Sequence, residues 1–292
     1  MIKPPVWPRW SKMASVGDTL AQAVSRLKLA HIETARIDSD ILLREALGWS
    51  RADMIAHHQD EVPPDILNQF WSWVGRRERA EPIAYILGRA AFWKSEFKVS
   101  PAVLIPRPET EGVVEHGLVA IEGKTDPVIL DIGTGSGAIL ISLLLENSGA
   151  HGLGSDISRR ALDIAQTNIT THSLSSRAKL MHSDYFENIS GRFDLIVSNP
   201  PYIEEKVLPT LKADVIGFEP RRALNGGTDG LNAYRVICEH AKKLMKPKAS
   251  LVMEIGFDQK VAVTKLLKTN SYQEINCYQD LAGHDRIMTA KI

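Results

Sequence analysis

The stretch VILDIGTGSGAI, residues 128–139, decides the fold of this chain. Residues 128–131, three apolar side chains followed by Asp131, predict a short buried strand, and the mainly apolar run 138–145 predicts a helix. Glycines 133, 135 and 137 lie between them, and glycine lets the backbone turn sharply and come close to a ligand. A strand, a glycine-rich turn and a helix in this order predict an α/β protein with a ligand at the strand end.

Short apolar runs and helical patterns alternate around this stretch, from about residue 109 to the end of the chain. Further strands are predicted at residues 152–156, 179–182, 194–198 and 250–255, and helices at 159–169 and 231–245. Residues 273–292 are typical of two more strands joined near Ala282-Gly283. The pattern predicts a doubly wound, mainly parallel sheet.

The first third of the chain has a different, helical spacing of apolar residues. Residues 17–80 carry apolar side chains at helical spacing and predict four consecutive helices, the second ending at Gly48. Alternating aromatic residues such as Phe92 and Phe97 then predict a small hairpin. We expect an N-terminal helical bundle over residues 1–85 that recognises the substrate, a β-hairpin linker over 86–108, and the sheet domain over 109–292.

Composition narrows the class of protein. The 292 residues include 35 Lys+Arg and 35 Asp+Glu, and residues 1–85 hold eleven of each sign, so no basic surplus points to nucleic acid. Two cysteines imply no disulfide framework and favour the reduced cytoplasm. No apolar run reaches the roughly 18 residues that span a bilayer, so no membrane association is expected. Residues 1–14 match no motif, and Met1 to Met13 are interpreted as a leader, with Met13 an alternative start.

The glycine turn is compatible with two ligands. Gly133, Gly135 and Ala138 satisfy the G-x-G-x-x-A pattern of dinucleotide-binding proteins. Asp156 ends the next strand, where an acid commonly accepts hydrogen bonds from ribose hydroxyls. The negative charge of a pyrophosphate would, however, lie unfavourably close to the acid Asp131, just before the first glycine. S-adenosyl-L-methionine is a net cation, which three acids at strand ends, Asp131, Asp156 and Asp184, would attract. Charge therefore favours the methyl donor over a nicotinamide cofactor.

A second motif, Asn199-Pro200-Pro201-Tyr202, follows the predicted strand 194–198 directly. Two prolines fix two φ angles and push Asn199 out of helical space. The Asn199 side-chain oxygen and the Pro200 carbonyl are then neighbouring acceptors, suited to the two N–H donors of a conjugated NH₂ group. The Tyr202 ring can lie against that flat group and fix its tilt.

Four motifs in order make the chain resemble the PrmC/HemK family, which methylates the Gly-Gly-Gln glutamine of class I peptide chain release factors. They are IPRPETE (105–111), DIGTGSGAI (131–139), NPPYI (199–203), and FEPRRAL with GGTDGL (218–231). The resemblance runs from about residue 80 to the end, and residues 1–85 resemble the family's N-terminal domain less strongly. It implies a seven-stranded, Rossmann-like class I methyltransferase domain after a small all-helical domain and a hairpin.

The resemblance also implies roles for individual residues. Gly133, Thr134, Gly135, Ser136 and Gly137 would hold the methionine part of S-adenosyl-L-methionine, Asp156 the ribose, and Tyr185 would lie beside the adenine. Asn199, Pro200, Pro201 and Tyr202 would bind the substrate glutamine, with Asn199, Pro200 and Tyr202 catalytic and Asn199 also near the cofactor. Arg107, Glu109 and Glu111 belong to a loop that is expected to pack near the site, either beside the ligand or as a salt-bridged structural loop. They are not assigned as catalytic, and neither are Glu219 and Arg221. No metal site is expected, because His57, His58 and His284 lack metal-ligand spacing.

The sequence thus predicts a protein-(glutamine-N5) methyltransferase that acts mainly by placing its reactants in line. An adenine-N6 DNA or RNA methyltransferase uses the same Asn-Pro-Pro-Tyr motif to bind an exocyclic amine and remains an alternative. The neutral helical domain disfavours it, because such an enzyme must also bind phosphates. A non-enzymatic adaptor that binds release factors is a second alternative. Two intact motifs in one domain speak against it.

Overall fold

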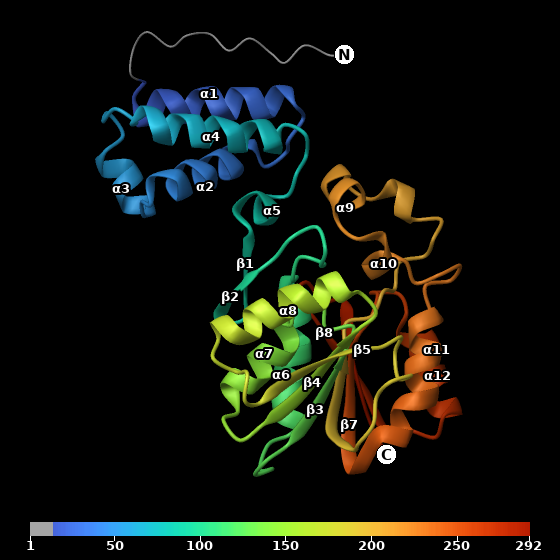
Figure 1. Ribbon diagram of the computed structural model, residues 1–292. Helices are drawn as coiled ribbons and strands as arrows, with labels where there is room; N and C mark the ends of the chain where they lie inside the picture. The colour runs from blue at the N-terminus through green and yellow to red at the C-terminus, as the bar shows by residue number, and fades with distance from the viewer. Residues whose placement is uncertain (1–13) are drawn as a thin grey trace. The chain divides into compact units, whose positions relative to one another are not determined.

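The computed structural model describes residues 14–292, and the predicted leader, Met1 to Met13, lies outside the described residues. The chain divides into two compact units with the boundary between Leu87 and Gly88. Figure 1 shows the helical first unit in blue and the sheet of the second unit in green to red. The predicted helical N-terminal region is confirmed.

Five helices form the first unit: α1 (Val16–Leu29), α2 (Ala35–Leu47), α3 (Arg51–Ala56), α4 (Pro64–Arg77) and α5 (Ile83–Leu87). The first four correspond to the predicted helices, and Gly48 ends α2 in a left-handed conformation. Leu27, Leu42 and Phe70 are fully buried in its core. Arg77 forms a buried ion pair with Asp38 at 2.7 Å, which ties α4 to α2.

The second unit opens with the predicted hairpin, β1 (Arg89–Phe92) and β2 (Ser95–Lys98), which pair antiparallel. Phe92 and Phe97 bury their rings in the hydrophobic core that also covers one face of the large sheet. The hairpin therefore packs on the sheet as part of the same unit.

Seven strands form the large sheet, in the order β5-β4-β3-β6-β7-β9-β8. Their bounds are β3 (Val128–Ile132), β4 (His151–Asp156), β5 (Ala178–His182), β6 (Phe193–Ser198), β7 (Met245–Glu254), β8 (Gln273–Gln279) and β9 (Asp285–Lys291). The first five in spatial order pair parallel, and β9 runs antiparallel to both β7 and β8. The predicted seven-stranded, mainly parallel α/β fold is confirmed.

Helices cover both faces of this sheet (Figure 1). One face packs against α6 (Glu111–Ala120), α7 (Ala138–Glu146) and α8 (Arg159–Thr171), and the other against α11 (Asn232–His240) and α12 (Lys260–Thr269). Successive residues of a strand point to opposite faces, and accordingly Ile129 belongs to the first core and Leu130 to the second. Burial on both faces explains the continuous apolar runs of the central strands.

The structure corrects one prediction and adds several short elements. The helix predicted at 231–245 ends at His240, a 3-10 turn η3 (Ala241–Leu244) follows, and β7 already begins at Met245. The chain tightens into η3 after His240, and Met245 then pairs with Phe193 of β6, so sheet pairing ends the helical segment early. Seven elements were not predicted from the sequence: α5, α6, α12, the 3-10 turns η1 (Pro108–Thr110) and η2 (Leu208–Thr210), and the short helices α9 (Ala213–Phe218) and α10 (Arg221–Leu224).

Candidate active site

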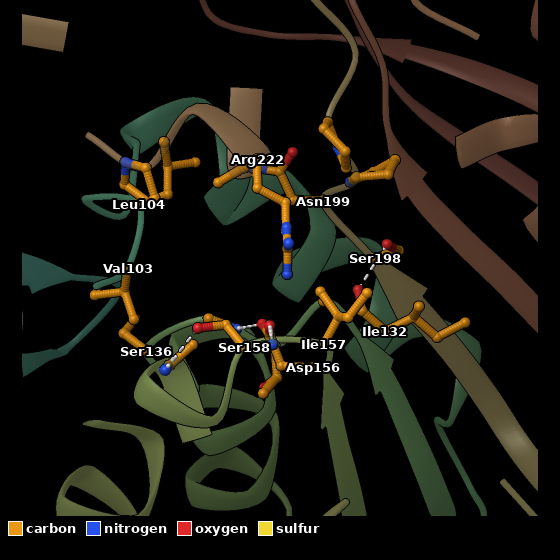
Figure 2. A pocket seen from close by; sticks show the side chains of 18 of the residues that line it. Val103, Leu104, Ile132, Ser136, Asp156, Ile157, Ser158, Ser198, Asn199 and Arg222 are labelled. Carbon is orange, nitrogen blue, oxygen red and sulfur yellow. Dashed lines mark hydrogen bonds between the residues drawn. The ribbon is translucent and has the colours of Figure 1, made fainter. Parts of the chain in front are cut away.

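A cavity of about 600 Å³ lies at the carboxyl ends of β3, β4 and β6, within the second unit. Figure 2 shows Ser136, Asp156 and Ser158 on one side of it and Asn199 and Arg222 on the other. Most of the predicted site residues line this cavity: Gly133, Thr134, Gly135, Ser136, Asp156, Tyr185, Asn199, Pro200 and Pro201. Gly137 and Tyr202 lie outside the lining. The fold therefore brings the two motifs, 66 residues apart in the neighbouring strands β3 and β6, to one site.

The glycine loop is held against the end of β4. The backbone N–H groups of Gly133 and Thr134 both donate to the Ser155 carbonyl at 2.9 Å. Gly135 has a φ of +58°, a left-handed conformation that favours glycine, and its N–H donates to Asp156 Oδ2 at 3.0 Å. Gly137 caps the N-terminus of α7, which explains why it does not reach the cavity.

Asp156 joins the glycine loop to the start of α8. Its Oδ1 accepts a hydrogen bond from the Ser158 N–H at 2.8 Å, while Oδ2 accepts from Gly135. Burial raises the pKa of Asp156, and these two backbone hydrogen bonds act in the opposite direction. The carboxylate is thus held by two donors at the rim of the cavity.

Only two of the three predicted acids reach the cavity. Asp156 and Asp184 line it, whereas Asp131 is fully buried beneath the glycine loop. Asp131 Oδ2 accepts a hydrogen bond from Thr134 Oγ1 at 2.6 Å, and burial raises the pKa of Asp131 to about 7. The expectation of three acids around a cationic ligand is therefore wrong for Asp131, because its buried side chain bonds to Thr134 and does not line the cavity.

Tyr185 lies in the cavity wall next to Asp184. Its backbone has a φ of +42°, and its ring packs against the hydrophobic core on the α11 side of the sheet. Burial raises the pKa of the Tyr185 phenol, with a smaller contribution from the charge of Asp184. The ring is therefore a partly buried, neutral surface suited to a flat ligand group.

Asn199 is oriented by one hydrogen bond. Its Nδ2 donates to Thr110 Oγ1 at 2.9 Å, and Thr110 Oγ1 donates to Glu254 Oε2 at 2.5 Å. No residue of the described chain, 14–292, donates to Asn199 Oδ1. The side chain therefore lines the cavity with a free amide oxygen.

Tyr202 anchors the Asn-Pro-Pro-Tyr turn to the protein. Its hydroxyl donates to Glu254 Oε1 at 3.1 Å, and its carbonyl accepts from Gln259 Nε2 at 3.0 Å. A Cβ on Gly230 would lie 2.4 Å from the Tyr202 carbonyl oxygen, so only glycine permits this approach. The glycines of the 226–231 motif thus pack the turn rather than line the cavity.

The other charged motif residues form ion pairs and hydrogen bonds. Arg107 forms a close ion pair with the buried Glu219, and Arg221 pairs with Glu205 at 3.2 Å on the surface. Glu111 accepts a hydrogen bond from the Trp93 N–H at 2.7 Å. Of the three loop residues 107, 109 and 111, only Arg107 lines the cavity.

Four residues of the site were not predicted from the sequence: Thr110, Arg222, Glu254 and Gln259. Thr110 and Arg222 lie within two of the motifs quoted above, and Glu254 is an acid at a strand end, a signal already used for Asp156. The Arg222 guanidinium extends into the cavity (Figure 2), and its charge lowers the pKa of Asp156. Gln259 offers no signal in the sequence, because its role depends on contacts with Tyr202 and Gly230.

Two further features are absent from residues 14–292. No cluster of three or more His, Cys, Asp and Glu side chains is placed to hold a metal ion in this part of the chain. No helix in the same range combines the length and apolar character required to cross a membrane.

Known proteins match the chain over both units. The family model for the PrmC N-terminal domain matches residues 18–88, and the model for the methyltransferase small domain matches residues 118–255. A release factor glutamine methyltransferase of Caulobacter vibrioides is 40% identical over 267 residues, covering 91% of this chain and 92% of that protein. A release factor glutamine methyltransferase of Agrobacterium fabrum is 37% identical over 94% of this chain and 97% of its own.

Solved structures share the fold. The hMettl16 catalytic domain, solved with the MAT2A 3′UTR hairpin 6, has a TM-score of 0.56 and 14% identity, covering 78% of this chain and 81% of that one. Identity this low supports the fold alone. Identity and coverage with the two sequence relatives are far higher, and on that basis the chain belongs to the release factor glutamine methyltransferase family.

Proposed function

We propose that this enzyme transfers the methyl group of S-adenosyl-L-methionine to the side-chain amide nitrogen (N5) of the glutamine in the Gly-Gly-Gln motif of class I peptide chain release factors. The observation that carries the proposal is the Asn199 side chain, which lines the cavity, donates its NH₂ to Thr110 and keeps its amide oxygen free of donors from residues 14–292. An acceptor in that place suits an NH₂ group. Membership of the family supports this substrate over the adenine of a nucleic acid.

The cavity has the features that S-adenosyl-L-methionine requires. Its volume of about 600 Å³, the glycine loop and the two acids Asp156 and Asp184 fit a nucleoside with a positively charged sulfonium. When bound, the donor supplies an electrophilic methyl group. We assign the methionine part to Gly133–Gly137, the ribose hydroxyls to Asp156 and the adenine to Tyr185. Because Gly137 caps α7, its part in this assignment is to shape the loop.

The substrate amide would meet Asn199 and Pro200. The Asn199 Oδ1 and the Pro200 carbonyl would each accept one N–H, and the nitrogen lone pair would then point out of the amide plane toward the methyl group. We propose that Pro201 lines the substrate side of the cavity and that Tyr202 completes the site. The Tyr202 hydroxyl is committed to Glu254, so only the ring is available to a substrate.

The reaction needs orientation more than a strong base. The amide nitrogen attacks the methyl carbon, the carbon–sulfur bond breaks with its electron pair staying on sulfur, and the methylated nitrogen releases a proton to water. Among the described residues that line the cavity there is no histidine or lysine to act as base. Holding the amide in line can contribute about 7–11 kcal/mol, which accounts for catalysis by placement.

Recognition of the protein substrate would fall to the helical unit. Residues 1–85 hold eleven positive and eleven negative side chains, so this segment has no net positive charge to attract phosphates. We therefore propose a protein partner and no direct contact with nucleic acid. The two cysteines, Cys238 and Cys277, are both free, which suits the reducing cytoplasm that we propose as its compartment.

One experiment tests the proposed reaction. The protein is incubated with isotopically labelled S-adenosyl-L-methionine and a purified class I release factor, and in parallel with adenine-containing DNA and RNA. Mass spectrometry of the digested products locates the label. We expect it on the Gly-Gly-Gln glutamine of the release factor alone, and label on adenine would overturn the proposal.

A further inference from the structure

Glu254 is a buried acid beside the active site that has no assigned role. It is 1% exposed and is the last residue of β7, next to β6, whose Ser198 pairs with Met253 in the sheet register. Glu254 therefore lies level with the point where Asn199 leaves the sheet. Its carboxylate does not line the cavity, so it cannot touch a ligand there directly.

Both oxygens of this carboxylate accept hydrogen bonds from residues of the site. Oε2 accepts from Thr110 Oγ1 at 2.5 Å, and Oε1 accepts from Tyr202 OH at 3.1 Å. The hydroxyl is the donor in both bonds, so both hydroxyl protons point toward the carboxylate. Burial raises the pKa of Glu254, while the two hydrogen bonds and the charge of Arg286 lower it.

The direction of these bonds determines how the Asn199 amide is turned. Thr110 has one hydroxyl proton, and Glu254 takes it, so toward Asn199 the Thr110 oxygen can only accept. The Asn199 group 2.9 Å away must then be its NH₂, and its oxygen is turned to the opposite side. Thr110 is only 3% exposed, so little water can replace this contact.

We propose that Glu254 and Thr110 are positioning residues that set the polarity of the Asn199 amide, so that its oxygen rather than its nitrogen meets the substrate NH₂. Glu254 also holds the Tyr202 ring through its hydroxyl. The proposal rests on the proposed function in one respect, that the substrate donates an N–H to Asn199. The arrangement within the protein stands on the hydrogen bonds alone.

Substitution of Thr110 by valine or serine tests the proposal. Thr110→Val keeps the shape and removes the acceptor, whereas Thr110→Ser keeps the hydroxyl. We expect Thr110→Val to lower kcat about 10- to 100-fold at saturating substrate, the range found elsewhere when a residue that orients a functional side chain is lost. Thr110→Ser should retain kcat within about threefold, and thermal unfolding midpoints measured for both variants show whether a loss reflects folding.

A double substitution distinguishes positioning from general damage. If Thr110 acts through Asn199, then Thr110→Val should lower kcat by less than about twofold in an Asn199→Ala background. Glu254→Gln should resemble Thr110→Val, because its NH₂ can donate to Thr110 and let that hydroxyl turn toward Asn199. Equal kcat for the valine and serine variants, or a full additional loss in the Asn199→Ala background, would overturn the proposal.

A measurement without substrate separates this proposal from the proposed function. The side-chain NH₂ of Asn199 is assigned in a ¹⁵N spectrum by its absence from Asn199→Ala, and its exchange with solvent is followed. We expect Thr110→Val to speed that exchange at least about tenfold and Thr110→Ser to leave it within about threefold. Equal exchange in the two variants would sink the positioning proposal. If the wild-type enzyme transfers no labelled methyl group to the release factor, only the proposed function is contradicted.

Discussion

Replacing Asp156 with alanine tests the cofactor site most directly. In the proposed complex the carboxylate accepts hydrogen bonds from the ribose hydroxyls, and in the structure it also accepts from the N–H groups of Gly135 and Ser158 at 3.0 and 2.8 Å. Asp156→Ala therefore removes a ligand contact and two bonds that shape the glycine loop. Two separate losses are expected, one in affinity and one in stability.

The magnitudes follow from the type of bond. A hydrogen bond to a charged acceptor contributes about 1.5–3 kcal/mol, so loss of the ribose contact should raise the Kd for S-adenosyl-L-methionine roughly 10- to 150-fold. Loss of the two backbone contacts should lower the free energy of unfolding by about 2–3 kcal/mol, because relief of the buried charge offsets part of the cost. Asp156→Asn keeps one acceptor oxygen and should fall between alanine and wild type in both measurements.

Titration calorimetry with S-adenosyl-L-methionine gives the affinity, and urea denaturation gives the stability. Asp163→Ala is the matched control, because Asp163 is an exposed acid on α8 and the substitution removes the same charge outside the cavity. Unchanged affinity in Asp156→Ala would refute the ribose assignment, even if stability falls. An equal loss of affinity in Asp163→Ala would show that the net charge of the protein, rather than a hydrogen bond to Asp156, determines the affinity for S-adenosyl-L-methionine.

Three further outcomes are expected. In single-turnover assays the rate should fall in the order wild type, Asn199→Asp, Asn199→Ala, because aspartate keeps the acceptor yet adds a carboxylate near Glu254 and near the sulfonium; equal rates for both variants would contradict an acceptor role. Deleting residues 1–85 should raise KM far more for an intact release factor than for a Gly-Gly-Gln peptide, and equal increases would leave the helical unit a scaffold. The pKa of Asp131 is raised to about 7 in the folded protein, so its contribution to stability is present below about pH 4 and is lost as pH rises to about 7. The free energy of unfolding of wild type relative to Asp131→Asn should therefore fall by at most about 4 kcal/mol over that range. If this difference, measured by denaturation at each pH, does not change with pH, the raised pKa of Asp131 is contradicted.

Local patterns determined the fold class and the two main motifs. Strands and helices around residues 128–198 follow from the period of apolar side chains, the turn at 133–137 from its glycines, and the rigid segment at 199–202 from its prolines. These effects act through the backbone of a few neighbouring residues, which is why the sequence displays them. The end of α11 is different, because Met245 pairs with Phe193 of β6 and no local pattern indicates that pairing.

The tertiary structure decided which side chains meet. Thr110 and Glu254 are 144 residues apart and Tyr202 and Glu254 are 52 apart, so no spacing in the sequence indicates that one carboxylate joins them. Asp131 and Asp156 both end strands, yet one side chain is buried beneath the loop while the other lines the cavity. The face on which a side chain lies, and hence its pKa and its partners, depends on how strands and helices pack, and that packing is a property of the whole chain.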